Sequence, residues 1–485
     1  MRKRLINKKI SNTKLNQQMS RRRFLSGSMS AAAGLGLRTL ATGLPVGFLM
    51  TGAMPAYGND SENKKLILAM SDDGESINSY SPGTYASDTN DVRSQFHRPN
   101  SSQLGLNSFG EVNGNNVFAD DFANSAEFMM GDTKVEAAKF LSYLPQDLLD
   151  RSQFFHLNTA ANGHAEGINV HGVNSGLTGI NGRGKEEIQS ALMQEMLLKN
   201  SGLTSILTTP MVLNGGGGQL GTLYNEGVAI TRYSPLDVKN LFLGEDTESD
   251  IDKINRVYEH TIDSIYNEVK QNGTPAQLRY LDAHASSRSQ AVALGDELGE
   301  LLTNVTSDSR SDQIDAAVAM LKANLATVVV IRYSYSSDNH SDPSLRGEVD
   351  LTIEHLNTLT NLWNLLKDQE LENQINYANY DIFGRTFLRN SQGGRDHHRS
   401  SCVNMMIGSN IKPGVIGGLE ALTNDNLIAS ATGINSNTGL SENPDITNNE
   451  TLLAYARTLM SSVGISEERL DVRLPAGKTV FGAMT

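Results

Sequence analysis

Short apolar runs alternate with longer stretches of helical periodicity along much of the chain. Residues 64–70 form an apolar run that ends in acidic and small residues, and residues 327–333 (TVVVIRY) form a continuous β-branched run. Both patterns predict buried strands, and the second is typical of a central strand covered on both faces. Further strands are expected at residues 377–383 and 403–407.

Helices are expected where apolar residues recur three or four positions apart. Residues 251–269 and 353–366 have this spacing, which predicts amphipathic helices that face a core. Residues 312–325 and 450–463 are also expected to be helical. The alternation of strands and helices predicts an α/β sandwich with a mostly parallel central sheet covered by helices.

Three polar segments are expected to lie outside these elements. Residues 101–132 are rich in Asn, Gly and Ser, which predicts a long irregular segment of the kind often tied to a site. Residues 431–449 are expected to form a loop. The glycines at 215–218 are not followed by Lys and Ser or Thr, so a flexible turn is favoured over a phosphate-binding loop.

The beginning of the chain has the pattern of an export leader. Residues 20–25 (SRRRFL) place arginines before an aromatic residue and a leucine, as in a twin-arginine signal. Residues 1–59 hold ten Lys or Arg and no Asp or Glu. A retained membrane helix is disfavoured because Arg38 interrupts the apolar run, and an arginine at the centre of a spanning helix costs roughly 2.5 to 3.5 kcal/mol.

We therefore expect a twin-arginine signal peptide over residues 1–58 and a single domain over residues 59–485. The twin-arginine translocase would be the partner during export. The mature protein would be periplasmic or secreted, with no stable transmembrane anchor after cleavage. Twin-arginine substrates cross the membrane folded, so a metal could be loaded before export.

Charge and cysteine content restrict the remaining possibilities. Without the leader the chain carries 31 basic and 54 acidic residues, a net charge of −23 that argues against nucleic acid as a partner. Cys402 is the only cysteine, so no intrachain disulfide can form.

Acidic residues and histidines lie at the ends of four expected strands. Ligands of open α/β sheets bind beyond the carboxyl ends of the strands, and oxygen and nitrogen donors there suit Zn, Mn or Mg. Two such ions could clamp a phosphoryl or sulfuryl group. The candidate ligands of a divalent metal, Zn or Mn in the first place, are Asp72, Asp338, His340, Asp381, Asp396 and His397.

These acidic residues and histidines could also lie in surface loops or solvated turns without a metal. An Asp followed two residues later by a His is common in surface loops, and Arg395 and Arg399 flank residues 396–398 as they would in a solvated polar turn. His156, His164 and His171 recur at intervals of eight and seven, and a loop over the strand ends could supply His164 as a further ligand.

The motifs resemble an exported bacterial family, domain of unknown function 1501, which is distantly similar to the alkaline phosphatase and sulfatase superfamily. Residues 383–418 (FGRTFLRNSQGGRDHHRSSCVNMMIGSNIKPGVIGG) are similar to the family order Ser-Glu-Phe-Gly-Arg-Thr, Asn/Gly loop, Asp-His-Gly, strand and Gly-Gly turn. Residues 336–340 (SSDNH) resemble its Gly-Trp-Asp-Thr-His element. Residues 71–78 (SDDGESIN) resemble its first loop, and residues 162–166 (NGHAE) a Ser-His segment.

This resemblance implies an alkaline-phosphatase-like fold and a metal-dependent hydrolase of phosphate or sulfate esters. It implies a Ser or Thr nucleophile after the first strand, for which Ser76 is the candidate. Arg385 and Arg395 would bind an anionic small molecule or envelope component, although such arginines often pair with a structural carboxylate. A formylglycine sulfatase is disfavoured, because Cys402 is followed by Val-Asn-Met and not by x-Pro-x-Arg.

Three departures from the family pattern favour a second hypothesis, and one of them is that the tryptophan of its Gly-Trp-Asp-Thr-His element is absent here. Ile382 stands where the family has Glu, and Asp381 is displaced by one residue, which on a strand turns a side chain to the other face. His398 stands where the family has Gly after Asp-His. The alternative is a non-catalytic periplasmic binding or envelope-assembly protein on a degenerate hydrolase fold.

Overall fold

The chain divides into two compact units. The computed structural model describes residues 64–71, 74, 77–86, 93, 109–166, 170, 211–213, 224–225, 228–229, 232–243, 298–322, 326–333, 338–422, 425–475 and 477–485. The smaller unit comprises Met1–Gly58, Ser201–Leu207 and Pro235–Ser307, and the larger one Asn59–Asn200, Thr208–Ser234 and Asp308–Thr485. The expected boundaries at residues 58 and 59 stay predictions, because both lie outside the described residues.

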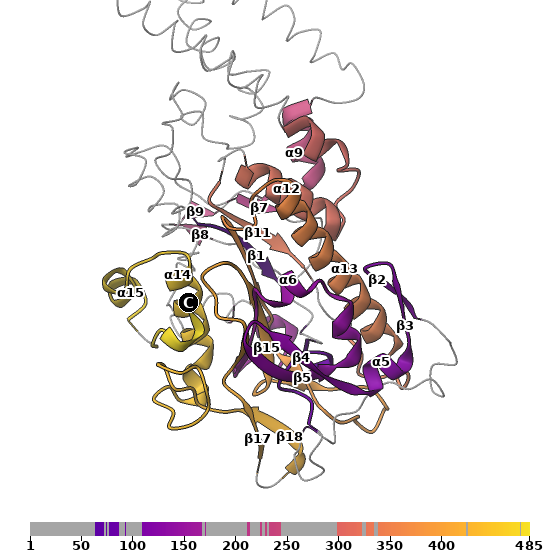
Figure 1. Cartoon of the computed structure of the whole chain (residues 1–485), viewed down its shortest axis with the longest axis vertical. Coiled ribbons are helices and arrows are strands. Elements are labelled where there is room, and N and C mark those ends of the chain that lie inside the picture. Colours follow the sequence, from indigo (N-terminus) through magenta and orange to yellow (C-terminus); the bar gives the residue numbers. More distant parts are fainter. Residues whose placement is uncertain are drawn as a thin grey trace, which may run out of the picture. The chain divides into compact units, whose positions relative to one another are not determined.

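Within the described residues, an eight-stranded sheet forms the centre of the larger unit, in the order β10-β7-β11-β1-β12-β15-β6-β16 (Figure 1). Only β15 runs antiparallel to its neighbours, so the carboxyl ends of the other strands share one edge. This confirms the α/β class with a mostly parallel sheet. The strands are β1 (Lys65–Met70), β6 (Ser152–Leu157), β7 (Met211–Leu213), β10 (Arg232–Tyr233), β11 (Val328–Arg332), β12 (Ile375–Tyr380), β15 (Cys402–Ile407) and β16 (Gly414–Ile416).

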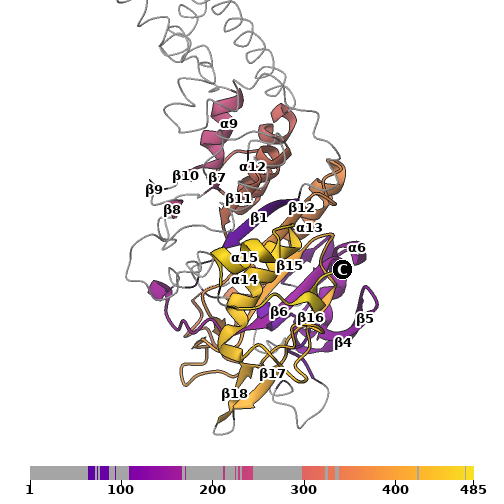
Figure 2. The ribbon, with the colours of Figure 1, turned by 90° about the vertical axis from the view of Figure 1, so that its left-hand side faces the viewer.

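Helices cover both faces of this sheet. Figures 1 and 2 show α14 and α15 on one face and α12 and α13 on the other. On α13 the buried positions include Val349, Ile353, Leu356, Leu359 and Trp363, the stripe that its spacing predicts. Among the described residues, the α-helices of this unit are α5 (Ala119–Ala123), α6 (Gln146–Leu149), α12 (Arg310–Lys322), α13 (Arg346–Asp368), α14 (Thr451–Ser462) and α15 (Glu467–Arg473), and α9 (Pro235–Leu243) belongs to the smaller unit.

Residues 109–132 correct one expectation, because they are largely regular where an irregular segment was expected. They form the hairpin of β2 and β3, helix α5 and the strand β4, which pairs with β5. Val112, Val117 and Phe122 are fully buried, and the burial of these apolar side chains orders the segment despite its polar composition.

Among the described residues, further strands outside the central sheet include β2 (Gly110–Val112), β3 (Asn115–Val117), β4 (Ser125–Met130), β5 (Thr133–Ala138), β8 (Tyr224–Asn225), β9 (Val228–Ala229), β17 (Leu419–Leu422) and β18 (Asp425–Ala431).

Most other expected elements are confirmed. The strands expected at residues 64–70, 327–333 and 403–407 match β1, β11 and β15, and the helices expected at 312–325, 353–366 and 450–463 match α12, α13 and α14. The strand expected at residues 377–383 begins earlier and ends at Tyr380. The expected helix at 251–269 and the glycines at 215–218 lie outside the described residues.

Among the described residues, no helix combines the length and apolar character that crossing a membrane requires.

Candidate metal centre

The candidate site lies at the edge of the sheet where the parallel strands end. Asp338 and His340 follow β11, and His164 lies in the 3₁₀ helix η4 (His164–Glu166) after β6. His397 lies on β14 (His397–His398), a short strand that precedes β15 and pairs with β13 (Gly384–Arg385). Because β15 alone is antiparallel, the segment before its amino end reaches the same edge as the segments after the other strands.

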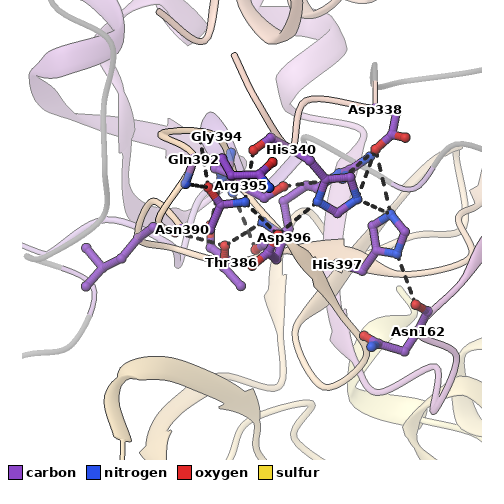
Figure 3. Close-up of polar contacts among 12 residues, drawn as sticks. Asn162, Asp338, His340, Thr386, Asn390, Gln392, Gly394, Arg395, Asp396 and His397 are labelled. Atoms are coloured by element: carbon purple, nitrogen blue, oxygen red, sulfur yellow. Dashed lines mark hydrogen bonds and ion pairs between the residues drawn. The ribbon is translucent and has the colours of Figure 1, made fainter. Parts of the chain in front are cut away.

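Three ligand-type atoms face one another at this edge. The Nε2 atom of His340 lies 3.0 Å from Nε2 of His397 and 3.1 Å from Oδ1 of Asp338 (Figure 3). The third distance, from His397 Nε2 to Asp338 Oδ1, is 3.8 Å. Ligands about 2.0 to 2.1 Å from a tetrahedral zinc ion are about 3.3 Å apart, so this spacing suits one face of such a site.

Hydrogen bonds on the far side of each ring set which nitrogen carries the proton. His397 Nδ1 lies 3.0 Å from the carbonyl oxygen of Asn162, which can only accept. His340 Nδ1 lies 2.9 Å from Oδ1 of Asp396. Both Nδ1 atoms therefore donate, and in the neutral rings both Nε2 atoms present lone pairs to each other.

Two lone pairs and a carboxylate oxygen at these distances repel one another unless a positive charge lies among them. Burial lowers the pKa of His397, and Arg385, His340 and His164 lower it further against the opposing bond to Asn162. Protonation of His397 is thus disfavoured. The positive charge is supplied either by a proton between the two Nε2 atoms, which lie at hydrogen-bond distance, or by a metal ion, and the donor set fits a metal ion. Oriented imidazoles with an acceptor behind Nδ1 are the usual arrangement of histidine metal ligands.

His164 extends the donor set. Its Nε2 atom lies 3.8 Å from Oδ2 of Asp338. Ligand atoms of His164, Asp338 and His397 all lie within 4.8 Å of one another, so these three side chains could hold a metal ion. Together with His340 they offer four donors from three segments of the chain.

Asp396 lies behind the site and supports His340. It also accepts a hydrogen bond of 2.7 Å from Nδ2 of Asn390. Partial burial acts to raise the pKa of Asp396, but the bonds from Asn390 and His340 outweigh it, and the pKa lies below its usual value. Asp396 is therefore ionised at neutral pH and holds the proton on His340 Nδ1.

Phe383 is the apolar wall of the site. Its ring stacks on that of His397 with centroids 3.9 Å apart, and it meets the His164 ring edge-on at 5.2 Å. A Cβ atom on Gly74 would come 2.1 Å from this ring, and φ of Gly74 is +79°. Gly74 thus lies against Phe383 at a position that requires glycine, while Asp72 and Ser76 lie outside the described residues.

The two candidate arginines have different surroundings. Arg385 is buried, and its Nη1 lies 3.5 Å from Oδ1 of Asp338, so its guanidinium faces the site. Arg395 is buried as an ion pair with Glu348. Arg395 therefore pairs with a buried carboxylate, as the alternative interpretation of these arginines expects. Substrate binding by either arginine stays a prediction.

Asp381 lies in a separate polar cluster within the sheet. It is fully buried, accepts a bond of 3.1 Å from Nδ2 of Asn379, and its backbone N–H donates to Oδ1 of Asn404 at 3.3 Å. Ile382 is part of the hydrophobic core. Of the predicted ligands, the structure brings together Asp338, His340, Asp396 and His397, and gives Asp381 other partners.

Sequence reasoning missed Asn162, Asn390 and Glu348. Asn162 acts through its backbone carbonyl, which leaves no signal in the sequence. Asn390 belongs to the Asn/Gly loop of the family pattern, which could have suggested it. Glu348 lies in the first turn of α13, where an acidic residue is ordinarily explained by the helix dipole.

Comparison with protein-family models gives no match to this chain, and neither does comparison with curated proteins. The resemblance to the domain-of-unknown-function 1501 family therefore stays a prediction. The mixed, mostly parallel eight-stranded sheet supports the α/β class.

Proposed function

We propose that this chain is an exported, metal-dependent hydrolase of phosphate or sulfate esters. The supporting observation is the pair of imidazoles whose Nε2 atoms face each other at 3.0 Å beside Asp338 while both Nδ1 atoms donate elsewhere. Imidazole and carboxylate donors at this spacing favour Zn, with Mn as the other candidate.

The metal, when bound, would supply a Lewis acid for an ester oxygen and lower the pKa of bound water. The chain would contribute the rest. Asp338, His340 and His397, with His164, would hold the ion. Arg385 faces this group and would donate hydrogen bonds to an anionic oxygen of the substrate.

The family resemblance supports Ser76 as the nucleophile. Gly74, two residues before Ser76, lies against Phe383, which stacks on His397, and this also supports Ser76 as the candidate. The twin-arginine pattern supports export and a periplasmic or secreted location, with the translocase as partner.

A second candidate is a non-catalytic exported protein that binds or assembles envelope components on a degenerate hydrolase fold. Ile382 favours it, because a core residue stands where the family places a glutamate. This protein would hold a metal or an anion without turning over an ester.

The two candidates are separated by assaying zinc content and hydrolysis of aryl phosphate and aryl sulfate together. The test compares the wild type with Asp338→Asn and with the matched control Asp350→Asn, whose carboxylate pairs with Arg346 on the surface of α13. The hydrolase predicts bound zinc and turnover, both lost in Asp338→Asn and kept in Asp350→Asn. Zinc without turnover supports the second candidate, and wild type without metal contradicts the proposed site.

A further inference from the structure

Glu348 lies between two of the segments that carry the proposed metal ligands, residues 338–340 and residues 395–397. It is 2% exposed, on the first turn of α13. Its Oε2 atom accepts a hydrogen bond of 2.5 Å from Nδ2 of Asn339, the residue between Asp338 and His340. Its Oε1 atom pairs with Arg395, the second residue before His397. One carboxylate therefore binds both segments, with one oxygen for each.

Arg395 also forms hydrogen bonds with the hairpin of β13 and β14 and with Asn78. It is fully buried, and its Nε donates to the carbonyl oxygen of Thr386 at 2.7 Å. Its Nη2 donates to Oδ1 of Asn78 at 2.8 Å, and Asn78 donates in turn to the carbonyl oxygen of Arg385. The guanidinium therefore fixes the strand pair that carries His397 and Arg385.

The two segments also touch directly. A Cβ atom on Gly394 would come 1.9 Å from the carbonyl oxygen of Asn339, so the backbones meet where only glycine fits. Asn390 donates to the carbonyl oxygen of His340 at 2.9 Å. These contacts set the distance between the two segments within narrow limits. The ion pair of Glu348 and Arg395 lies at their junction.

We infer that Glu348 is a positioning residue of the metal centre, which sets the distance between His340 and His397 by binding Asn339 and Arg395 at once. This inference rests on the proposed metal site. Outer groups that orient metal ligands typically change metal affinity by about 10- to 100-fold when they are lost. A buried ion pair by itself is weak evidence for stability, so the position of both partners beside the ligands carries the inference.

The test measures zinc affinity and metal-free stability separately. Asn339→Leu removes the bond to Oε2 of Glu348 and keeps the ion pair with Arg395, so the charge balance of the buried cluster is unchanged. Glu348→Gln alters both connections. The matched control is Glu354→Gln, on the same helix, whose carboxylate pairs with Arg310 and is largely exposed. The Kd for Zn(II) is measured by competition with a chromophoric chelator, and the Tm is measured in excess chelator.

We expect Asn339→Leu and Glu348→Gln to bind zinc about 10- to 100-fold more weakly, and Glu354→Gln to bind within about twofold of the wild type. If Asn339→Leu and Glu348→Gln lower the metal-free Tm but leave the zinc Kd unchanged, Glu348 is only structural and the inference fails. If Glu348→Gln does not fold, Asn339→Leu decides alone. A wild type that binds no zinc contradicts the proposed function instead, so the two failures are distinguishable.

Discussion

At the scale of single residues, the candidate site depends on which nitrogen of each imidazole carries a proton. The carbonyl oxygen of Asn162 and the carboxylate of Asp396 accept hydrogen bonds from the Nδ1 atoms, and the Nε2 atoms lie beside Asp338. The sequence could place His340 and His397 at strand ends, but it could not show this orientation. A backbone carbonyl and a loop conformation determine it, and neither has a residue signature.

Replacing Asp396 by Asn tests this orientation. An amide is a weaker acceptor than a carboxylate, so His340 Nδ1–H loses its charge-assisted partner and Nε2 becomes a poorer donor to metal. We expect the Kd for Zn(II) to rise by about tenfold or more. Competition titration measures it, with Asp350→Asn as control; equal affinities of Asp396→Asn and the wild type would rule out the role of Asp396.

Arg385→Lys tests anion binding beside the metal. Lysine keeps the charge but lacks the planar fork that binds two oxygens at once. We expect KM for an aryl phosphate to rise by about tenfold, with zinc content unchanged. Steady-state kinetics and elemental analysis check this together. A KM equal to that of the wild type would show that Arg385 does not contact the substrate.

At the scale of elements, strands of uniform apolar character were predicted at their observed positions, whereas the mixed strand β12 was predicted with shifted bounds and the mixed strand β6 was not predicted. β11 reads as a β-branched run, whereas β6 (SQFFHL) and β12 (INYANY) contain polar residues that are buried in the sheet. In β12 the side chain of Asn379 accepts a hydrogen bond from the backbone N–H of Met405 and donates one to Asn404, both on β15, and such pairing cannot be read from one segment. Asp381 likewise has its partners in Asn379 and Asn404, and its role as a metal ligand stays a prediction.

Tyr455→Phe tests how α14 is fastened to the sheet. The buried hydroxyl lies 2.7 Å from the carbonyl oxygen of Asn379 and 3.2 Å from that of Met405. We expect the free energy of unfolding to fall by about 1 kcal/mol, measured by urea denaturation. A free energy of unfolding equal to that of the wild type would contradict this role of the hydroxyl.

At the scale of the whole molecule, the order of secondary-structure elements predicted the α/β class and the edge of the sheet that carries the site. It did not predict that β15 is antiparallel, because a strand's direction depends on where the chain returns. That reversal brings His397 to the same edge as His340. The prediction of an irregular segment was wrong for residues 109–132. Packing onto elements distant in the sequence orders the strands of this segment, and such packing cannot be read from its composition.

Stability should fall in mild acid because two histidines are buried in the neutral form. Burial lowers the pKa of His156 to about 4 and that of His355 to about 3. The unfolded chain takes up these protons near pH 6.5 and the folded chain does not, so this stability is present above pH 6.5 and is lost as the pH falls towards 4.

Each such histidine contributes a slope of at most about 1.4 kcal/mol per pH unit in this window. Urea unfolding of the metal-free chain between pH 7 and 5 should show the fall, and His156→Gln should reduce its slope. A free energy of unfolding that is constant over this range would contradict the buried neutral state.

The most direct test of the metal centre is elemental analysis of the purified protein beside the double variant His340→Ala, His397→Ala. We expect about one zinc ion per chain in the wild type, since the three facing atoms of Asp338, His340 and His397 match one ion, and none in the variant. No metal in the wild type, or the same metal content in both proteins, would contradict it.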